Sequence, residues 1–280
     1  MAKTTTRKPP IRKKAAKKKK PFFSTKSAVI FLFILSIFLG LYHYRNAILY
    51  YFSFKSDKVI KADKVAQARI FQILKAHDHL TFGLDVSQYQ GEINWVEIDS
   101  VEDNFKLDYV LIRATAGSDK VDSQYKDNWK GAKKQQLIRG AYHYYRPNEN
   151  SLEQAKNFIQ TVKLNKGDLP PVLDIEQLPN NQSMADLKKG LHRWLDKVEA
   201  NYNVKPIIYT GEKYYESFLK EEFKGYTFWI ANYNFFVEEI KDDWLFWQFT
   251  EKATIDGINE KVDLNIYNGT PKMLQYLTIN

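Results

Sequence analysis

Two acidic side chains, Asp174 and Glu176, stand two residues apart in the segment PPVLDIEQ. Prolines and apolar residues flank them, as in a buried strand, where residues i and i+2 point to the same face about 6.5–7 Å apart. Two carboxyl groups this close and partly removed from water cannot both ionise freely, so the pKa of one rises. A carboxyl group that keeps its proton near neutral pH can act as a general acid while its ionised neighbour stabilises positive charge or positions a reacting group. Cleavage of a glycosidic bond needs that division of roles.

The same pair also fits a plainer interpretation, a solvated strand end whose acids pair with nearby lysines. Other polar residues favour a site instead. Eight short apolar runs follow one another from Leu80 onward, and polar residues stand at the carboxyl ends of most of them: Asp85, Arg113, Thr115, His143, Tyr144, Tyr145, Asp174, Glu176, Tyr209, Asn232, Tyr233 and Gln248. In a parallel barrel these ends open on one face, where catalytic groups gather.

These residues need a scaffold of strands and helices to position them. The eight runs, rich in β-branched and aromatic residues, lie at residues 80–87, 108–115, 139–145, 170–176, 205–210, 226–233, 244–250 and 261–267. Helix-like stretches at residues 122–136, 150–162 and 183–202 separate several of them. This alternation predicts an α/β fold with a parallel sheet, closed as a modified (β/α) barrel of the TIM type with eight strands. The later runs are closely spaced, so we expect fewer helices than strands.

The basic charge of the chain belongs to its amino-terminal part. The formal net charge is +9, but residues 1–56 contain 13 Lys or Arg and no Asp or Glu, which leaves the rest of the chain at 9 minus 13, or −4. A mildly acidic folded part lacks the electrostatic footprint of a nucleic-acid-binding domain, so we expect no nucleic-acid partner. The chain has no Cys, which excludes disulfides, thiolate metal sites and a cysteine nucleophile.

An apolar segment follows the basic tail. No residue from Ala28 to Tyr44 is charged and most are large and apolar, which is about the lower limit for a membrane span. Because the positive flank is amino-terminal, the tail is expected in the cytoplasm and everything after Arg45 on the exported side. The alternative is a cleaved signal peptide, which usually has a shorter apolar run and an A-x-A cleavage pattern that this chain lacks. We expect an uncleaved anchor.

The chain therefore divides into four predicted parts: a basic cytoplasmic tail (1–26), a transmembrane anchor or signal-anchor (27–45), a juxtamembrane helical stalk (46–79) and a barrel domain (80–280). The stalk is predicted from apolar residues that recur every three or four positions between Asp57 and His79. The stretch HDH at residues 77–79 is interpreted as a polar turn rather than a metal site, because three consecutive side chains cannot easily face one ion.

Seven motifs in order carry a resemblance to a known family. They are FGLDVSQYQGEINW (82–95), YVLIRATAGSD (109–119), GAYHYYRP (140–147), PPVLDIE (170–176), PIIYT (206–210), FWIANY (228–233) and FWQFT…VDLNIY (246–267). Together they resemble glycoside hydrolase family 25, the muramidase-type lysozymes, over nearly the whole of residues 80–270. The resemblance implies a modified (β/α) barrel and hydrolysis of the β-1,4 bond between N-acetylmuramic acid and N-acetylglucosamine in peptidoglycan. It also implies retention of anomeric configuration, with no metal and no cofactor.

By motif position, the resemblance assigns the general acid to Glu176. Its partner is Asp174, either as nucleophile or as the group that steers the 2-acetamido oxygen of the substrate. Asp85 and Asp263 are implied as two further acids of the cleft; the plainer alternatives are a turn cap for Asp85 and a loop contact for Asp263. The family commonly has KATEG where this chain has RATAG, so Ala116 replaces a frequent Glu. That difference leaves substrate preference and optimum pH open.

Six further residues are candidates for binding sugar. Tyr144, Trp229, Tyr233 and Trp247 are either core aromatics or sugar contacts. Asn232 and Gln248 are polar groups at strand ends that can hydrogen-bond to sugar or to a catalytic acid. His143 is interpreted as a satisfied barrel residue, because the carboxylates already suffice for the chemistry.

The function predicted from these residues is a membrane-anchored peptidoglycan hydrolase. It is expected in the bacterial cytoplasmic membrane, crossing it once, with the barrel on the exported side beside its glycan-strand substrate. The alternative is an inactive or altered-specificity glycan-binding scaffold, because a fold does not ensure activity. The presence of all four acids favours the enzyme, since a binding protein has no need for a close acid pair.

Overall fold

The computed structural model describes residues 25–53, 64–102 and 104–280, and the chain divides into two compact units. The first unit ends at Arg45 and the second spans Asn46–Asn280. The first contains one long helix, and the second contains all of the described strands.

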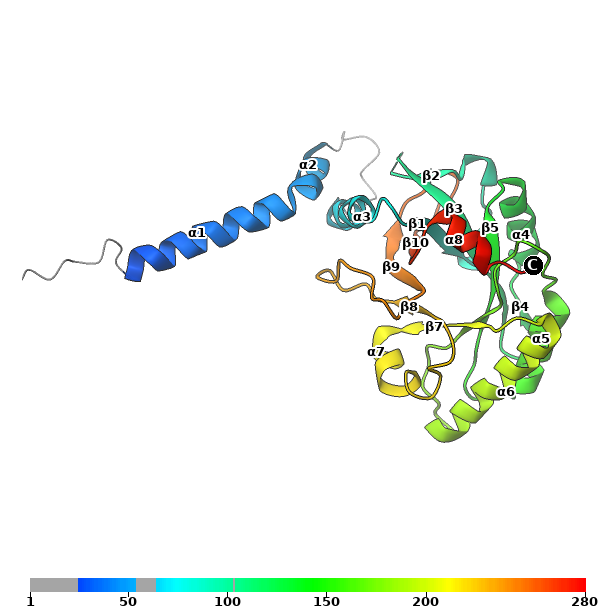
Figure 1. The fold of residues 1–280 in the computed structure, drawn as a ribbon. Helices are drawn as coiled ribbons and strands as arrows, with labels where there is room; N and C mark the ends of the chain where they lie inside the picture. The colour runs from blue at the N-terminus through cyan, green and yellow to red at the C-terminus, as the bar shows by residue number, and fades with distance from the viewer. Residues whose placement is uncertain (1–24, 54–63, 103) are drawn as a thin grey trace, which may run out of the picture. The chain divides into compact units, whose positions relative to one another are not determined.

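Helix α1 (Thr25–His43) is apolar along almost its whole length (Figure 1). Its window Lys26–His43 has a mean hydropathy of 1.8, and none of it is buried within the protein. By length and composition this helix could cross a membrane, and a signal sequence near the amino terminus has the same properties. The predicted apolar helix is thus present, and the short helix α2 (Arg45–Ser53) follows it. Residues 1–24 of the predicted tail lie outside the described residues.

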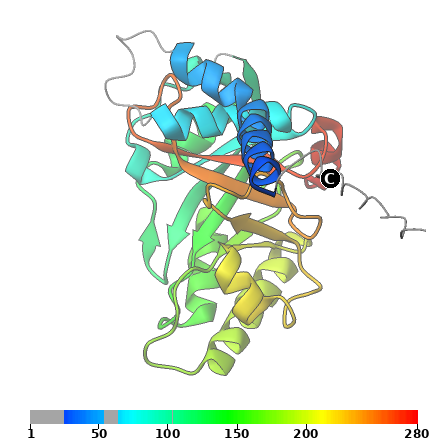
Figure 2. The same ribbon diagram turned by 90° about the vertical axis from the view of Figure 1, so that its left-hand side faces the viewer.

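Eight strands close into a barrel in the second unit (Figures 1 and 2). They are β1 (Thr81–Val86), β3 (Phe105–Ala116), β5 (Ile138–Tyr144), β6 (Val172–Asp174), β7 (Ile207–Gly211), β8 (Phe228–Ala231), β9 (Phe246–Ala253) and β10 (Val262–Tyr267). They follow one another around the ring in chain order, and β10 closes the ring on β1. The short strands β2 (Ser100–Val101) and β4 (Lys120–Val121) pair with β3 outside the ring. All eight strands coincide with runs predicted from the sequence.

One strand departs from the predicted parallel arrangement. Pairing is parallel from β1 through β3, β5, β6, β7 and β8 to β9, but β10 is antiparallel to both β9 and β1. The connection between β9 and β10 spans only residues 254–261, which is too short for the crossover that a parallel pair requires. The barrel is therefore mixed, and the amino-terminal end of β10 lies at the carboxyl ends of the other strands.

Helices cover only part of the barrel, as the short gaps between the later strands predict. They are α3 (Lys64–Ala76), α4 (Tyr125–Lys134), α5 (Ser151–Thr161), α6 (Met184–Tyr202), α7 (Glu212–Tyr214) and α8 (Pro271–Leu277), with 3-10 helices η1 (Gln88–Gln90) and η2 (Trp95–Glu97) and a π-helix η3 (Tyr215–Leu219). The three predicted helices are confirmed as α4, α5 and α6. The side chains of Asn150 and Ser183 cap the amino termini of α5 and α6, which lie side by side in both views.

Side chains alternate along the strands between the barrel interior and the outer core beneath the helices. The interior is filled by a cluster that includes Tyr109, Val172 and Trp229. The outer core includes Leu173, Ile230 and Trp247. Gly83 is required where Tyr109 crosses the interior, because a Cβ atom at this position would lie 2.5 Å from the tyrosine ring. This alternation decides which polar side chains can reach the site.

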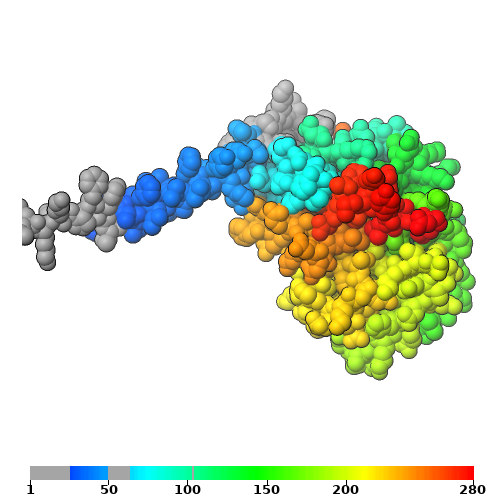
Figure 3. Space-filling model, viewed as in Figure 1, coloured from blue at the N-terminus to red at the C-terminus, as the bar shows by residue number. Residues whose placement is uncertain are grey.

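Helix α3 packs against the barrel. Ile70, Ile73 and Leu74 are fully buried in the outer core. Arg69 donates hydrogen bonds to backbone carbonyls of β9 and of the β8–β9 connection, at 2.8 Å to Phe249 and 2.9 Å to Asn234. Figure 3 shows α3, in cyan, next to this orange segment. We propose that the folded unit begins at α3 rather than at Leu80. Residues 54–63 of the predicted stalk lie outside the described residues.

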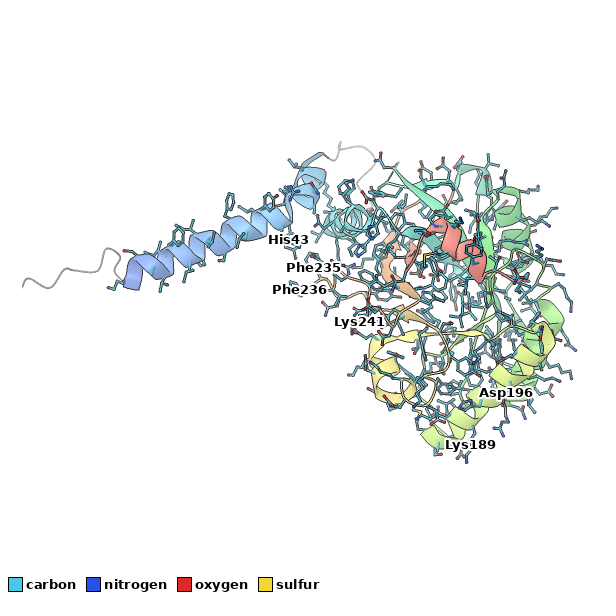
Figure 4. All side chains as sticks on the ribbon, in the orientation of Figure 1. His43, Lys189, Asp196, Phe235, Phe236 and Lys241 are labelled. Carbon is cyan, nitrogen blue, oxygen red and sulfur yellow. The ribbon has the colours of Figure 1, made fainter. Side chains whose placement is uncertain are left out.

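The β8–β9 connection that Arg69 holds also exposes two aromatic rings. Phe235 and Phe236 project from it in Figure 4, and Phe236 is 82% exposed. The connection begins at the carboxyl end of β8, where the barrel opens. Because Arg69 of α3 is bonded to this connection, α3 helps to shape one side of the opening.

Candidate active site

Asp174 is the last residue of β6, and Glu176 follows two residues later at the carboxyl ends of the parallel strands. Leu173 and Ile175 are buried in the outer core, so the alternation turns both acids toward the barrel interior. The N–H of Ile175 donates a 3.0 Å hydrogen bond to the carbonyl of Tyr209, which continues the extended pairing past the end of β6. The structure therefore brings the two acids to one face, as predicted.

The carboxyl groups of Asp174 and Glu176 are close enough for a side-chain hydrogen bond, which forms when one of them carries a proton. Burial raises the pKa of Asp174 well above its ordinary value, and the charge of Glu176 raises it further. Burial also raises the pKa of Glu176, because protein atoms surround its carboxyl group although one side is open to solvent. Among the described residues, Asp174 Oδ1 is buried without a hydrogen-bond partner. The pair thus keeps a proton at pH values where an isolated carboxyl group has lost it.

A second pair of acids lies next to the first. Asp85 on β1 and Asp263 on β10 are directly opposite in the antiparallel register, a position in which Cβ atoms are about 4.5–5.5 Å apart. Burial raises the pKa of Asp85 to about 6, against hydrogen bonds that lower it. Burial and the charge of Asp85 raise the pKa of Asp263 to about 9. The charge of Glu176 acts on both groups, so the four acids form one electrostatic cluster.

Buried amide groups hold the carboxylate of Asp85. Gln248 Nε2 and Asn265 Nδ2 each donate a 2.7 Å hydrogen bond to Asp85 Oδ2. The amide oxygen of Gln248 accepts in turn from the hydroxyl groups of Tyr209 and Tyr233. Because the oxygen of an amide accepts and its nitrogen donates, these contacts fix the orientation of the Gln248 side chain. Gln248 therefore bonds to an acid of the cluster, one of the two roles predicted for it.

The two tryptophans predicted as possible sugar contacts are core residues. Trp229 lies inside the barrel, where its Nε1 donates a 2.7 Å hydrogen bond to Asn265 Oδ1 and its ring contacts Tyr209. Trp247 lies in the outer core and donates a 3.0 Å hydrogen bond to the carbonyl of Asn232. Both rings are at most 1% exposed, so a sugar cannot reach them. Trp229 supports the site through Asn265, whereas Trp247 points to the other face of its strand.

Tyr144 and Tyr233 are the accessible aromatic candidates. Tyr144 ends β5 opposite Asp174, and burial together with the charges of Glu176 and Asp174 raises its pKa to about 12. Tyr233 follows β8 and is 41% exposed, with its hydroxyl group bonded to Gln248. Both rings therefore stand at the carboxyl ends of the strands, beside the acids, with surface left for a ligand.

Asn232 shapes the loop after β8. Its Oδ1 accepts a 2.8 Å hydrogen bond from the N–H of Asn234, and its Nδ2 donates to Glu212. The side chain is 8% exposed. Its described contacts are to protein groups, so its role in the structure is to hold the turn that presents Tyr233.

His143 is a neutral packing residue, as predicted. Its Nδ1 lies 2.7 Å from Thr115 Oγ1, and its Nε2 lies 3.1 Å from Gln154 Oε1. Burial lowers its pKa to about 4, and its ring stacks on Trp194 of α6. It faces the helices, away from the acids.

Three residues of the site were not predicted as site residues. Asn265 stands two positions after Asp263 on β10 and shares its face, so the strand alternation could have identified it. Tyr142 lies in the barrel interior, where the charges of Asp85 and Arg113 both act on its pKa. Arg113 also lowers the pKa of Asp174. Arg113 stands at the carboxyl end of a predicted run, but its approach to Asp174 depends on the closure of the barrel, and no local sequence signal marks Tyr142.

The arrangement defines a class of enzyme. Four carboxyl groups with raised pKa values stand together at the carboxyl ends of the barrel strands, so the site can protonate a leaving oxygen and stabilise developing positive charge in one step. Among the described residues, no group of three or more His, Asp or Glu side chains is placed to hold a metal ion. A mixed barrel with such a site is that of a glycosidase.

Comparisons with known proteins identify the family. The family model for "Glycosyl hydrolases family 25" matches residues 84–258. YegX of Escherichia coli strain K12 is 39% identical over 197 residues, which cover 69% of this chain and 71% of YegX. Lysozyme M1 of Streptomyces globisporus is 29% identical over 214 residues, 71% of each chain. The structure of a family 25 glycosyl hydrolase from Bacillus anthracis matches with a TM-score of 0.63 and 29% identity, over 72% of this chain and 95% of that one. This chain belongs to glycosyl hydrolase family 25, and it is a glycosidase of the lysozyme type.

Proposed function

We propose that this protein is a membrane-anchored muramidase that hydrolyses the β-1,4 bond between N-acetylmuramic acid and N-acetylglucosamine in peptidoglycan. The observation that carries the proposal is the placement of Asp174 and Glu176 side by side at the carboxyl end of β6, where burial raises the pKa of both carboxyl groups. Membership of glycosyl hydrolase family 25 and the similarity to lysozyme M1 support the choice of substrate.

Glu176 is the general acid of the proposed reaction. It is the member of the pair that is open to solvent, so its carboxyl group can reach the glycosidic oxygen. The hydrogen bond to Asp174 lets the shared proton pass to Glu176 before it is donated to the leaving group. General acid catalysis of this kind contributes about 10²–10⁴-fold to a rate.

Asp174 assists the reaction rather than attacking the sugar. A carboxylate nucleophile stands about 5–5.5 Å from the acid in retaining glycosidases. Asp174 is instead hydrogen-bonded to Glu176 and almost fully buried. We infer that it steers the 2-acetamido group of the substrate, whose oxygen bonds to the anomeric carbon as the glycosidic bond breaks. Water then opens this oxazolinium intermediate, and the anomeric configuration is retained.

The other site residues stabilise the charge that develops on the substrate or help to position its sugar rings. Asp85, held by Gln248 and Asn265, lies where a carboxylate stabilises the positive charge that develops on the sugar ring. Tyr144 and Tyr233 offer exposed ring surface for sugar contact. Asp263 keeps its proton and shares a hydrogen bond with Asp85.

The amino-terminal helix gives the enzyme its proposed location. The length and hydropathy of α1 are sufficient to cross a bilayer. The Lys and Arg residues that precede it keep the tail in the cytoplasm by the positive-inside rule, so the barrel is exported. The enzyme is thereby held at the bacterial cytoplasmic membrane, on the side where peptidoglycan lies.

The test is hydrolysis of purified peptidoglycan by the full chain in detergent, compared with Glu176→Gln and with the exposed control Glu97→Gln. Released fragments are identified by mass spectrometry with reducing-end analysis. We expect fragments that end in reducing N-acetylmuramic acid, a loss of at least about 10²-fold in Glu176→Gln and no loss in Glu97→Gln.

Two other outcomes would contradict the proposal. Fragments that end in reducing N-acetylglucosamine would show a different bond specificity. Intact glycan strands with retained binding would favour a glycan-binding scaffold on the same fold.

A further inference from the structure

A pocket next to the catalytic pair is lined by three cations and by the buried Asp122, and of its lining residues only Tyr144 has a part in the steps above. Its volume is about 440 Å³, and its lining includes Tyr89, Arg113, Ala116, Lys120, Tyr144 and Arg146. Tyr144 connects it to the site, because the charges of Glu176 and Asp174 act on its hydroxyl group. Arg113 acts on the pKa of both Tyr144 and Asp174. A group bound in this pocket would therefore lie beside the reacting bond.

The guanidinium group of Arg113 is hydrogen-bonded through Nε, which leaves its two terminal NH2 groups available to a ligand. Its Nε donates a 2.8 Å hydrogen bond to Asp122 Oδ2, and the group lies 4.6 Å from the centre of the Tyr89 ring. Asp122 is buried and also accepts from the backbone N–H groups of Gln88 and Gln124. Among the described residues, none accepts a hydrogen bond from Nη1 or Nη2 of Arg113. Two parallel donors of this kind match the two oxygens of a carboxylate.

Lys120 and Arg146 add positive charge to the pocket wall. Asp119 lies 3.4 Å from Lys120 and 3.7 Å from Arg146, but its side chain is 63% exposed, so water screens these pairs. Glu149 contacts Arg146 at 3.1 Å. Asn157 of α5 donates a 3.0 Å hydrogen bond to the carbonyl of Lys120, which fixes the β3–β4 hairpin. The wall is thus built before any ligand arrives.

Ala116 keeps the pocket open. It is directly opposite Lys120 in the β3–β4 register, a position in which two side chains are neighbours. A methyl group leaves the space in front of Lys120 and Arg113 free, and it brings no charge of its own. A carboxylate at this position would instead fill the space and pair with Lys120.

We propose that this pocket binds a carboxylate group of the substrate, carried by the lactyl group of muramic acid or by the peptide attached to it. The inference rests on the proposed muramidase function, because it names the group by which that site recognises its glycan. N-acetylglucosamine carries no carboxylate, so the pocket selects strands that contain muramic acid over neutral chitin-type strands.

The test uses the full chain in detergent with Glu176→Gln to prevent turnover, and calorimetric titration with three tetrasaccharides. One is a neutral N-acetylglucosamine tetramer, the second alternates N-acetylglucosamine with muramic acid that has a free lactyl carboxylate, and the third is the second with its peptides attached. We expect one or both charged glycans to bind about tenfold tighter than the neutral one, the range of a charged hydrogen-bonded contact. Tighter binding of the second assigns the lactyl carboxylate, and tighter binding of the third assigns the peptide.

Three substitutions then locate the effect. Ala116→Glu should abolish the preference for charged glycan, whereas Ala116→Gln, of nearly equal size, should keep most of it. Lys272→Gln on α8, which follows the antiparallel strand β10, serves as a control for surface charge far from the pocket. Equal affinity for the three glycans, or a preference that Ala116→Glu leaves unchanged, would overturn the pocket proposal.

The two proposals fail in distinguishable ways. Wild-type hydrolysis of peptidoglycan with equal affinities for charged and neutral glycans contradicts the pocket alone. A preserved charge preference without hydrolysis of any glycan contradicts the muramidase function alone.

Discussion

At the residue scale, the four acids stand closer together than stability alone would favour. Like charges directly opposite on paired strands are destabilising, and Asp85 and Asp263 occupy such positions. Two amide donors on Asp85 and a retained proton on Asp263 make the pair tolerable. Sites that hold such strain are commonly maintained at the expense of stability, because the chemistry requires it.

Replacing Asp263 with Asn should therefore stabilise the protein, and more so as the pH rises. The pKa of Asp263 is raised from 3.8 to about 9 in the folded state, so the folded chain binds this proton more tightly than the unfolded chain. Stability from this group is present at low pH and is lost as the pH rises from about 4 toward about 9. We expect Asp263→Asn to have a higher Tm than the wild type at pH 8. Each kcal/mol added to the free energy of unfolding should raise the Tm by about 2–4 °C.

The measurement is thermal unfolding followed by circular dichroism at pH 5 and pH 8, with the exposed Asp242→Asn as control. The difference between Asp263→Asn and the wild type should grow from pH 5 to pH 8, while Asp242→Asn should follow the wild type. A difference that shrinks with rising pH would show that Asp263 is ionised in the folded protein. Hydrolytic activity of Asp263→Asn should fall, since an amide cannot exchange a proton with Asp85.

The alternation of side chains between the two faces of a strand explains which site residues could be predicted. Trp247 and Gln248 are adjacent in one strand, so only one of them can face the interior, and the structure shows that it is Gln248. The same rule places Asn265 on the face of Asp263. The alternation of side chains along one strand can be predicted from the sequence. The partners of Asp85 cannot, because they come from strands about 160 and 180 positions away.

At the element scale, the direction of β10 decides whether the site can form. The strands were predictable because each is a short apolar run, but the direction of a strand depends on its non-local partners. Asp263 lies near the start of β10. In a fully parallel barrel it would stand at the opposite end from Asp174, and the antiparallel pairing of β10 with β1 places it opposite Asp85 instead. The motif resemblance identified Asp263 as a candidate without this geometry.

Helix α3 should be required for the barrel to fold stably. Its three fully buried side chains, Ile70, Ile73 and Leu74, together contribute roughly 5–9 kcal/mol of apolar burial, at about 1.5–3 kcal/mol each. A domain is stable by only about 5–15 kcal/mol. We therefore expect a fragment of residues 64–280 to unfold cooperatively in urea, and a fragment of residues 80–280 to lose most or all of its stability.

Point substitutions in the full chain provide the matched comparison. Ile73→Ala should destabilise the barrel by about 2–5 kcal/mol, the usual range for truncating a buried aliphatic side chain. Val65→Ala, at a site that is 54% exposed on the same helix, should change the free energy of unfolding by less than about 0.5 kcal/mol. Equal stability of the two fragments would show that α3 is an appendage and that the folded unit begins at Leu80.

At the scale of the whole molecule, the charge and hydropathy of the chain separate its two units. Residues 1–56 contain thirteen Lys or Arg and no Asp or Glu, while the remaining chain has a formal charge of −4 (9 minus 13). Such a pattern is readable without any structure, because it depends on composition and not on packing.

We expect the full chain to remain in the membrane fraction after carbonate extraction, with an intact mass that includes residues 25–43. The apolar window Lys26–His43 is long enough to span a bilayer, and a charged residue at the centre of such a helix costs about 2.5–3.5 kcal/mol on insertion. Leu35→Arg should therefore shift the protein to the soluble fraction, whereas Leu35→Ala should leave it in the membrane.

Protease added to intact spheroplasts should digest the barrel and spare the tail if the barrel is exported. A mature chain that begins after Arg45 and is released without detergent would identify a cleaved signal peptide, and the enzyme would then reach its glycan by secretion instead of tethering.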